Sequence, residues 1–134
     1  MKKEKSCGIM VFKDDTVLLV HHNKGHWGFP KGHVEENETE HETAIRETKE
    51  ETNVDAKIIG DFREVITYSP KPNVLKDVVF FIGEAETFDL KPQLEEASEV
   101  KYVNISETLN LINDDMREML IQGFNEYHKI KDNN

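Results

Sequence analysis

The feature that most constrains this chain is a group of three acidic residues, Glu47, Glu50 and Glu51. In a helix with about 100° per residue, positions i, i+3 and i+4 share one face, so the three carboxylates fall within an arc of roughly 100°. Three like charges this close repel one another. The pattern therefore favours a cation among them, and hard divalent cations such as Mg²⁺ or Mn²⁺ prefer oxygen ligands.

A longer pattern surrounds these acids. Gly32 is followed after five residues by Glu38, and after seven more by Arg46-Glu47 and then Glu50-Glu51. This spacing resembles the signature of the Nudix hydrolases, which cleave nucleoside diphosphates linked to another moiety. The resemblance implies an α+β fold of the Nudix type, an α/β/α sandwich with a mixed central sheet, which we expect to form one domain over residues 1–134.

Two positions depart from the family pattern. Thr48 stands where an aliphatic residue is usual, and Asn53 stands where glycine is usual. Asn53 comes just after the expected helix end, where a positive φ is common, and Asn tolerates that conformation better than any residue except Gly. Thr48 would face the sheet with less apolar surface, which concerns stability more than chemistry.

The segment before the acids is the run from Trp27 to Glu35. Pro30 favours an extended backbone for Phe29 before it, and the glycines on either side permit a sharp bend. Lys31 is interpreted either as a solvated turn residue or as a compact positive charge that meets phosphate. The run resembles the corresponding segment of a Nudix subgroup, the asymmetrical diadenosine tetraphosphate hydrolases.

Thr39 and Glu42 predict a capping box at the start of a helix that continues to Thr52. Only Ala44 and Ile45 are clearly apolar across this helix, so core packing alone explains it poorly.

The resemblance implies roles for the polar residues of this region. Arg46 is expected to hold a carboxylate in place, with Glu38 reaching its guanidinium from the other side. The metal ligands implied are the Gly32 carbonyl, Glu47, Glu50, Glu51 and Glu96. Residues with a catalytic role would be Glu50, Glu51, Glu96 and Arg46, and the residues alone do not assign the general base among the glutamates.

Alternation and turn residues predict the strands. A hairpin is expected from 6–12 and 16–20, further strands from 54–59 and 62–68, a central strand from 74–85 and a short one from 100–103. Pro70 and Pro72 are expected to end the strand before them in a loop.

Three residues of the central strand match places where the subgroup contacts phosphate and adenine: Lys76, Phe80 and Phe81. Adjacent residues of a strand point to opposite faces, so at most one of the two phenylalanines can line a site. We take Lys76 and Phe81 as substrate-binding candidates, and core packing remains the alternative for both aromatic rings.

Glu95, Glu96 and Glu99 lie just before the last strand. From the residues alone they are solvated loop acids. The family places a distant glutamate six residues before the position of Tyr102, which selects Glu96, with Glu99 as the second choice.

A short helix over 106–111 and a longer one after Asn113 are expected to follow, with residues 129–134 frayed. Met116, Leu120, Phe124 and Tyr127 form the apolar stripe of the longer helix. Tyr127 packs in the core or stacks on a nucleobase, and His33 is a candidate substrate contact.

The composition argues against several classes of protein. The 134 residues carry a net charge of −10, which disfavours a broad nucleic-acid surface. No apolar run approaches the roughly 20 residues of a membrane span, and no secretory apolar core follows Met1. The single cysteine, Cys7, is expected in the core and fits a reducing cytoplasm. Oligomeric state is not indicated.

The function that the resemblance implies is divalent-metal-dependent hydrolysis of a small nucleoside polyphosphate. The first choice is diadenosine tetraphosphate, giving ATP and AMP. Nucleoside triphosphates, oxidised or not, and RNA 5′ ends are the alternatives within the family, and a nucleotide-binding module without catalysis is the alternative outside it.

Overall fold

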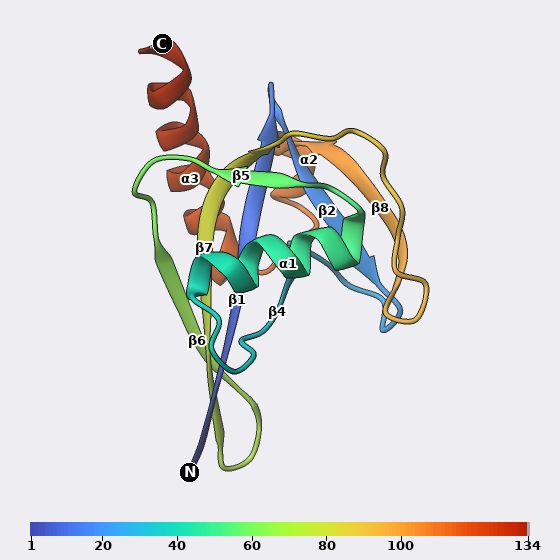
Figure 1. Cartoon of the computed structure of the whole chain (residues 1–134), viewed down its shortest axis with the longest axis vertical. Helices are drawn as coiled ribbons and strands as arrows, with labels where there is room; N and C mark the ends of the chain where they lie inside the picture. Colours follow the sequence, from blue (N-terminus) through green and yellow to red (C-terminus); the bar gives the residue numbers. More distant parts are fainter. Residues whose placement is uncertain (134) are drawn as a thin grey trace.

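The computed structural model describes residues 1–133, and Asn134 lies outside the described part. Eight strands form a single sheet with three helices around it (Figure 1). The strands are β1 (Lys2–Lys13), β2 (Thr16–His22), β3 (Trp27–Gly28), β4 (Lys31–His33), β5 (Ala56–Ile58), β6 (Glu64–Lys71), β7 (Val74–Ala85) and β8 (Ala97–Asn104). The helices are α1 (Glu40–Thr52), α2 (Ile105–Thr108) and α3 (Asp114–Asp132).

The sheet is mixed, as expected. Strands β1 and β7 run parallel at its centre, with Lys2 opposite Val74 and Val11 opposite Gly83. The other pairings are antiparallel. Strands β2 and β4 pair with β1, strands β5 and β6 pair with β7, and β8 pairs with β2. The predicted strand over 74–85 matches β7 to the residue.

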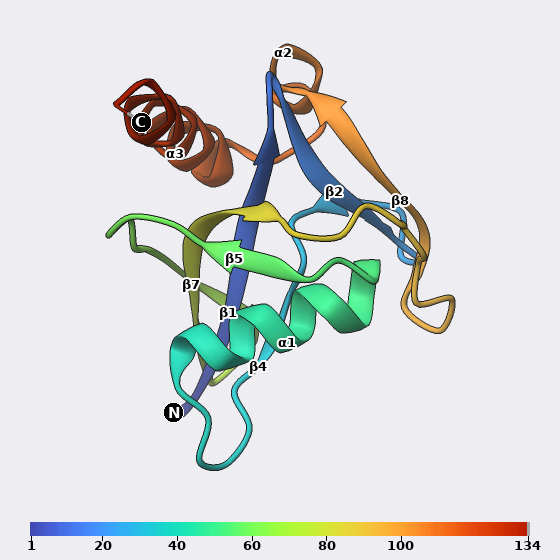
Figure 2. The ribbon, with the colours of Figure 1, turned by 45° about the horizontal axis from the view of Figure 1, so that its top comes forward.

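Each face of the sheet has its own apolar cluster. Helix α1 covers one face, where Cys7, Ile9 and Phe81 pack with Ala44. Helix α3 covers the other face, where Met10, Phe12 and Phe80 pack with Leu120. Figure 2 shows the two helices on opposite sides of the sheet, so the α/β/α sandwich is confirmed. Cys7 is fully buried, as predicted.

Several boundaries differ from expectation, and those of β6 and α3 have a clear physical reason. Strand β6 continues through Pro70 to Lys71, because it lies at an edge of the sheet where a missing N–H breaks no ladder, and its register shifts between Tyr68 and Lys71. Helix α3 continues to Asp132 instead of fraying at Lys129, because Ile130 packs against the core. Strand β8 is also longer than predicted. No helix within residues 1–133 combines the length and apolar character that crossing a membrane requires.

Candidate active site

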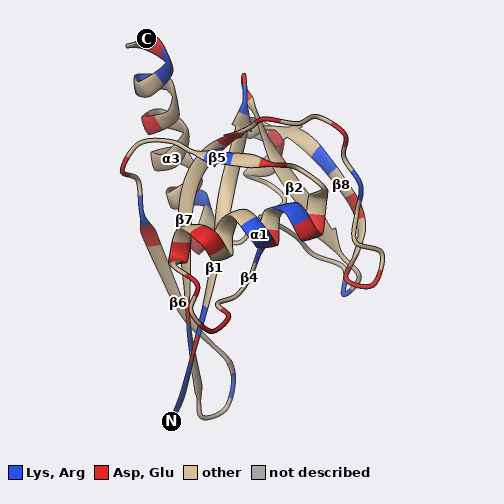
Figure 3. Cartoon of the chain, in the orientation of Figure 1, with Lys and Arg blue, Asp and Glu red and all other residues tan. Residues whose placement is uncertain are grey.

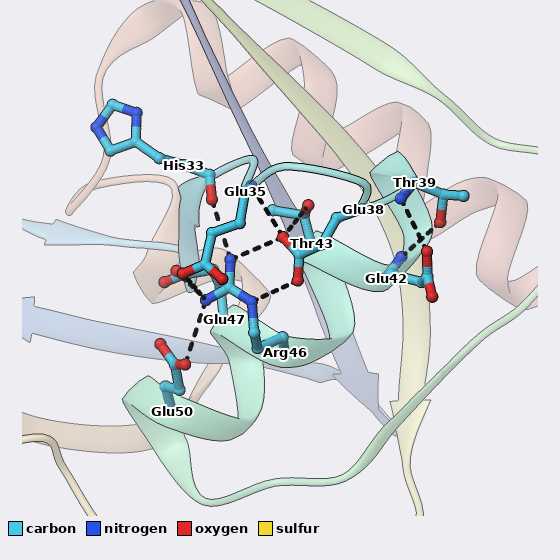
Figure 4. Close-up of polar contacts among 9 residues, drawn as sticks. All are labelled: His33, Glu35, Glu38, Thr39, Glu42, Thr43, Arg46, Glu47 and Glu50. Carbon is cyan, nitrogen blue, oxygen red and sulfur yellow. Dashed lines mark hydrogen bonds and ion pairs between the residues drawn. The ribbon is translucent and has the colours of Figure 1, made fainter.

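The start of α1 is fixed by the predicted capping box. The Thr39 hydroxyl accepts a hydrogen bond from the Glu42 backbone N–H at 3.1 Å, and the Glu42 carboxylate accepts one from the Thr39 N–H at 2.9 Å (Figure 4). Two N–H groups that the helix cannot satisfy internally are thereby paired. Because this fixes where the helix begins, it also fixes which face carries Glu47 and Glu51.

The threonines of α1 replace the missing apolar stripe. Thr43, Thr48 and Thr52 are fully buried against the sheet beside Ala44. The Thr48 hydroxyl donates to the Ala44 carbonyl at 2.8 Å, and the Thr52 hydroxyl donates to the Thr48 carbonyl at 2.6 Å. Since both hydroxyls are paired within the helix, the face can be buried without an unsatisfied polar group.

Arg46 is the centre of the polar network (Figure 4). Its Nε and Nη2 donate to the two carboxylate oxygens of Glu38 at 2.6 and 3.0 Å, and Nη1 donates to Glu47 at 2.8 Å and Glu50 at 3.2 Å. Nη2 also donates to the His33 carbonyl at 3.0 Å. Bonded mainly to Arg46, the Glu38 carboxyl has its pKa lowered to about 2. Arg46 therefore ties α1 to the loop before it with a planar, two-bonded ion pair.

Glu47 lies against the backbone of Gly32. A Cβ added at Gly32 would overlap the Glu47 carboxylate, so only glycine lets this side chain lie where it does. The Glu47 side chain is 15% exposed, and its burial raises the pKa while the Arg46 bond and charge oppose the rise. The glycine that opens the motif is thus in direct contact with the first acid of the helix.

Glu51 is the most buried acid of the group, at 3% exposure. Its Oε2 accepts one hydrogen bond from the backbone N–H of Lys31 at 3.1 Å. Burial raises the Glu51 pKa to about 8, and the charges of Glu47 and Glu96 add to the rise. A carboxylate removed from water with so few partners favours either a proton or a nearby cation.

Glu50 is more exposed than these two acids and shares the Arg46 Nη1 with Glu47. Its side chain is 46% exposed and bonds to Arg46. Within residues 1–133, no three His, Cys, Asp or Glu side chains are arranged to hold a metal ion. In the acidic group, Glu47 and Glu50 are instead bonded to the Arg46 guanidinium. The donors nevertheless fit a hard cation: oxygen atoms only, two of the carboxylates desolvated, with the Gly32 backbone against one of them.

Figure 3 shows acidic residues recurring along α1 and in the segment before it. Glu96 lies on the loop between β7 and β8. Its negative charge raises the pKa values of both Glu47 and Glu51. Glu99, the second choice, lies on β8 opposite His21 and pairs with Lys101 at 3.6 Å.

A cavity of about 690 Å³ lies on the α3 face of the sheet. Its walls come from the β2–β3 turn, the sheet and the start of α3, and they include His22, His26, Trp27, Ile66, Tyr68, Val78, Ile112 and Met116. Lys31 also lines it. Since the Lys31 backbone N–H bonds Glu51, this one residue connects the cavity with the carboxylates.

Lys76 lies on the same face as Lys31. Sheet register places Glu4, Tyr68 and Lys76 in one row, and Gly8, Lys31 and Phe80 in another row four residues along. Burial lowers the Lys76 pKa, and the Lys31 charge lowers it further. The two lysines predicted to contact phosphate therefore lie on one face of the sheet, where their positive charges repel each other.

Residues 2–122 match the family described as the NUDIX domain. The chain belongs to the Nudix family. A relative from Sus scrofa, named bis(5'-nucleosyl)-tetraphosphatase (asymmetrical), is 33% identical over 89% of this chain and 92% of its own. A solved structure of a C. elegans Ap4A hydrolase binary complex superposes with a TM-score of 0.82 at 26% identity, covering 94% of this chain and 98% of that one. A Nudix hydrolase from Clostridium perfringens shares the fold, with a TM-score of 0.79 at 19% identity over 95% and 99% of the two chains.

This Nudix hydrolase does not bring all the predicted substrate contacts to the cavity. Phe81 is 3% exposed on the α1 face, with its ring 4.4 Å from that of His41. Tyr127 is 6% exposed, and its ring lies 5.2 Å from that of Phe12 in the core. Both rings pack in the core, which was the alternative for each. His33 is exposed, and in Figure 4 its ring points away from Arg46, while its carbonyl joins the network.

The Nudix fold also exposes cavity residues that sequence reasoning missed. His22 and His26 stack at 4.6 Å, and Tyr68 faces the cavity from β6. Alternation along the strand from Glu64 to Tyr68 would have placed Tyr68 on the sheet face that Lys76 also occupies. No local pattern separates the two histidines from other polar turn residues.

Proposed function

We propose that this Nudix hydrolase hydrolyses a dinucleoside polyphosphate, with diadenosine tetraphosphate and water giving ATP and AMP. The observation that carries the proposal is the position of Lys31, whose side chain lines the cavity while its N–H bonds Glu51. A nucleoside held in the cavity would thus place its phosphates beside the carboxylates. The Sus scrofa relative and the C. elegans structure, by the activities in their names, support the choice of substrate.

The residues that would hold divalent cations, Mg²⁺ or Mn²⁺, are the Gly32 carbonyl, Glu47, Glu50, Glu51 and Glu96. When bound, such ions neutralise phosphate charge, polarise the scissile phosphate and lower the pKa of water. Lys31 and Lys76 add fixed positive charge on the cavity side. Arg46 holds Glu47 and Glu50, and the proton of the attacking water goes to Glu50, Glu51 or Glu96.

The substrate is proposed as a free small molecule rather than a nucleic acid, because the net charge of −10 repels a long polyanion. Reduced Cys7, buried and unpaired with any other cysteine in the sequence, is compatible with the cytoplasm that the sequence predicts.

The test is a product analysis with a substrate panel. The chain is incubated with Mg²⁺ and diadenosine tetraphosphate, nucleoside triphosphates or 5′-triphosphate RNA, and the products are separated by ion-exchange chromatography. Equal amounts of ATP and AMP, with the largest kcat/KM for the dinucleotide, are expected. Two molecules of ADP, or no turnover of the dinucleotide, would refute the assignment. Glu51→Gln is the matched inactive variant, because it keeps the shape and removes the charge.

A further inference from the structure

The loop between β7 and β8, residues 86–96, passes the end of α1 (Figure 1). Glu96 is its last residue. Two of its backbone N–H groups bond to the last turn of that helix: Lys91 to the Thr52 carbonyl at 3.0 Å, and Gln93 to the Glu51 carbonyl at 3.3 Å. The loop is therefore attached directly to the helix that carries the acidic group.

Asn53 adds a side-chain bond to this attachment. It ends α1 in the left-handed conformation with φ 68°, and its own N–H bonds the Lys49 carbonyl. Its side-chain Nδ2 donates to the Asp89 carbonyl at 2.8 Å. Glycine would adopt the same backbone conformation at no steric cost, but it has no amide to make this bond. The residue that departs from the family pattern thus makes a contact that the usual residue cannot.

Asn23 holds the other end of the loop. Its backbone N–H donates to the Glu96 carbonyl at 2.9 Å, and its side-chain Nδ2 donates to the Leu94 carbonyl at 3.2 Å. Two asparagine amides, one on the α1 side and one in the β2–β3 turn, therefore bond carbonyls of the same loop on both sides of Gln93.

We propose that Asn53 and Asn23 are positioning residues, whose side-chain amides hold the 86–96 loop so that the Glu96 carboxylate lies beside Glu47 and Glu51. The inference rests on the proposed function in one respect, that Glu96 acts in the site. Glu96 itself is exposed and makes no side-chain hydrogen bond within residues 1–133, so the backbone of its loop must place it. Small changes in such a placement have large kinetic effects.

The experiment is a double-mutant cycle. Asn53→Gly is made in the wild-type chain and in Glu96→Gln, and kcat and KM for diadenosine tetraphosphate are measured with Mg²⁺. Loss of one neutral hydrogen bond is expected to lower kcat by about fivefold, with KM changed by less than about twofold. In the Glu96→Gln background the same substitution is expected to change kcat by less than about twofold.

Asn73→Gly is the matched control. Asn73 also has a positive φ, 65°, in the turn between β6 and β7, and its side chain makes no hydrogen bond among the described residues. Asn73→Gly therefore adds the same conformational freedom to the unfolded chain as Asn53→Gly, but it changes no contact of the 86–96 loop. We expect kcat to stay at the wild-type value in this variant.

Two further readouts do not depend on turnover. Hydrogen exchange of the free protein should become faster at the Lys91 and Gln93 amides in Asn53→Gly and at the Glu96 and Ala97 amides in Asn23→Ala. Mn²⁺ titration calorimetry should show weaker binding in Asn53→Gly, but not when Glu96→Gln is already present.

Equal losses of kcat in both backgrounds, or unchanged exchange at Lys91 and Gln93, would overturn the positioning role. Absence of turnover in the wild-type chain would refute the proposed function instead, and the exchange and Mn²⁺ results would still decide the role of the asparagines.

Discussion

Gly32→Ala should separate the chemistry of the site from the stability of the fold. The new methyl group would overlap the Glu47 carboxylate, which is the far end of a flexible side chain. The side chain can therefore move aside at little cost in folding free energy, but it has to leave its place by about an ångström or more to restore ordinary contact distances. It would also lose its 2.8 Å bond from Arg46.

A displacement of this size in a catalytic group lowers the rate by about 100-fold, or roughly 2.7 kcal/mol. We expect that loss in kcat/KM for diadenosine tetraphosphate with Mg²⁺, measured by chromatography of the products. The free energy of unfolding, from urea denaturation, should fall by less than about 1 kcal/mol, because the three atoms nearest the new methyl group all belong to the end of the Glu47 side chain.

Gly123→Ala provides the converse control. There the added Cβ would lie 2.6 Å from the Met10 Cε and 3.2 Å from the Ile82 Cγ2, both in the core beneath α3. Overpacking should outweigh the better helix propensity of alanine and cost about 1 kcal/mol of stability, with kcat/KM unchanged. If Gly32→Ala loses stability and activity in proportion, as a damaged fold would, the contact with Glu47 is not the reason that position 32 is glycine.

Two other predictions follow from the charged groups. Burial, helped by the charges of His26 and Lys31, lowers the His22 pKa from 6.5 to about 4, so the unfolded chain binds more protons than the folded one between these values. The contribution of His22 to the free energy of unfolding should therefore be fully present above about pH 6.5 and decline by about 1–2 kcal/mol towards pH 4.5. His22→Gln should flatten this decline when thermal denaturation is measured at a series of pH values. The same pH dependence of stability in the variant and the wild-type chain would contradict the assignment. Arg46→Lys keeps the charge but loses the two-bonded contact with Glu38. It should lower the urea midpoint more than Arg63→Lys does, because the two 2.9 Å bonds of Arg63 to Glu40 are more exposed. Only Arg46→Lys should lower kcat/KM, by about tenfold. Equal effects of the two lysine variants on kcat/KM would show that Arg46 does not order the acids.

The contacts that order α1 could be predicted from the sequence because they are local. The capping box at Thr39, the contacts of Arg46 with Glu38 and Glu50, and the positive φ of Asn53 all depend on neighbours within eight residues, and each is present in the structure. Spacing along a helix suffices to place such groups.

Long-range packing was not accessible in the same way. Periodicity along β7 shows that Phe80 and Phe81 face opposite sides, but not which side holds the cavity, since both faces of this sheet are buried under helices. The polar face of α1 was also misleading, because Thr43, Thr48 and Thr52 bury their methyl groups while their hydroxyls are bonded. A pattern of apolar residues cannot reveal a core-facing surface made of threonine.

The structure also divides glutamates that the sequence leaves equivalent. Glu38 accepts bonds from Arg46, Thr43 and the Glu35 N–H, and its pKa is lowered to about 2. Glu51 has its single bond from Lys31, and its pKa is raised to about 8. The first carboxylate is satisfied by the protein and serves to hold the loop against α1. The second has hydrogen-bond acceptor sites that the protein does not fill, and a buried carboxylate left in this condition, bonded to a residue that lines the cavity, has the property that cation and substrate binding requires.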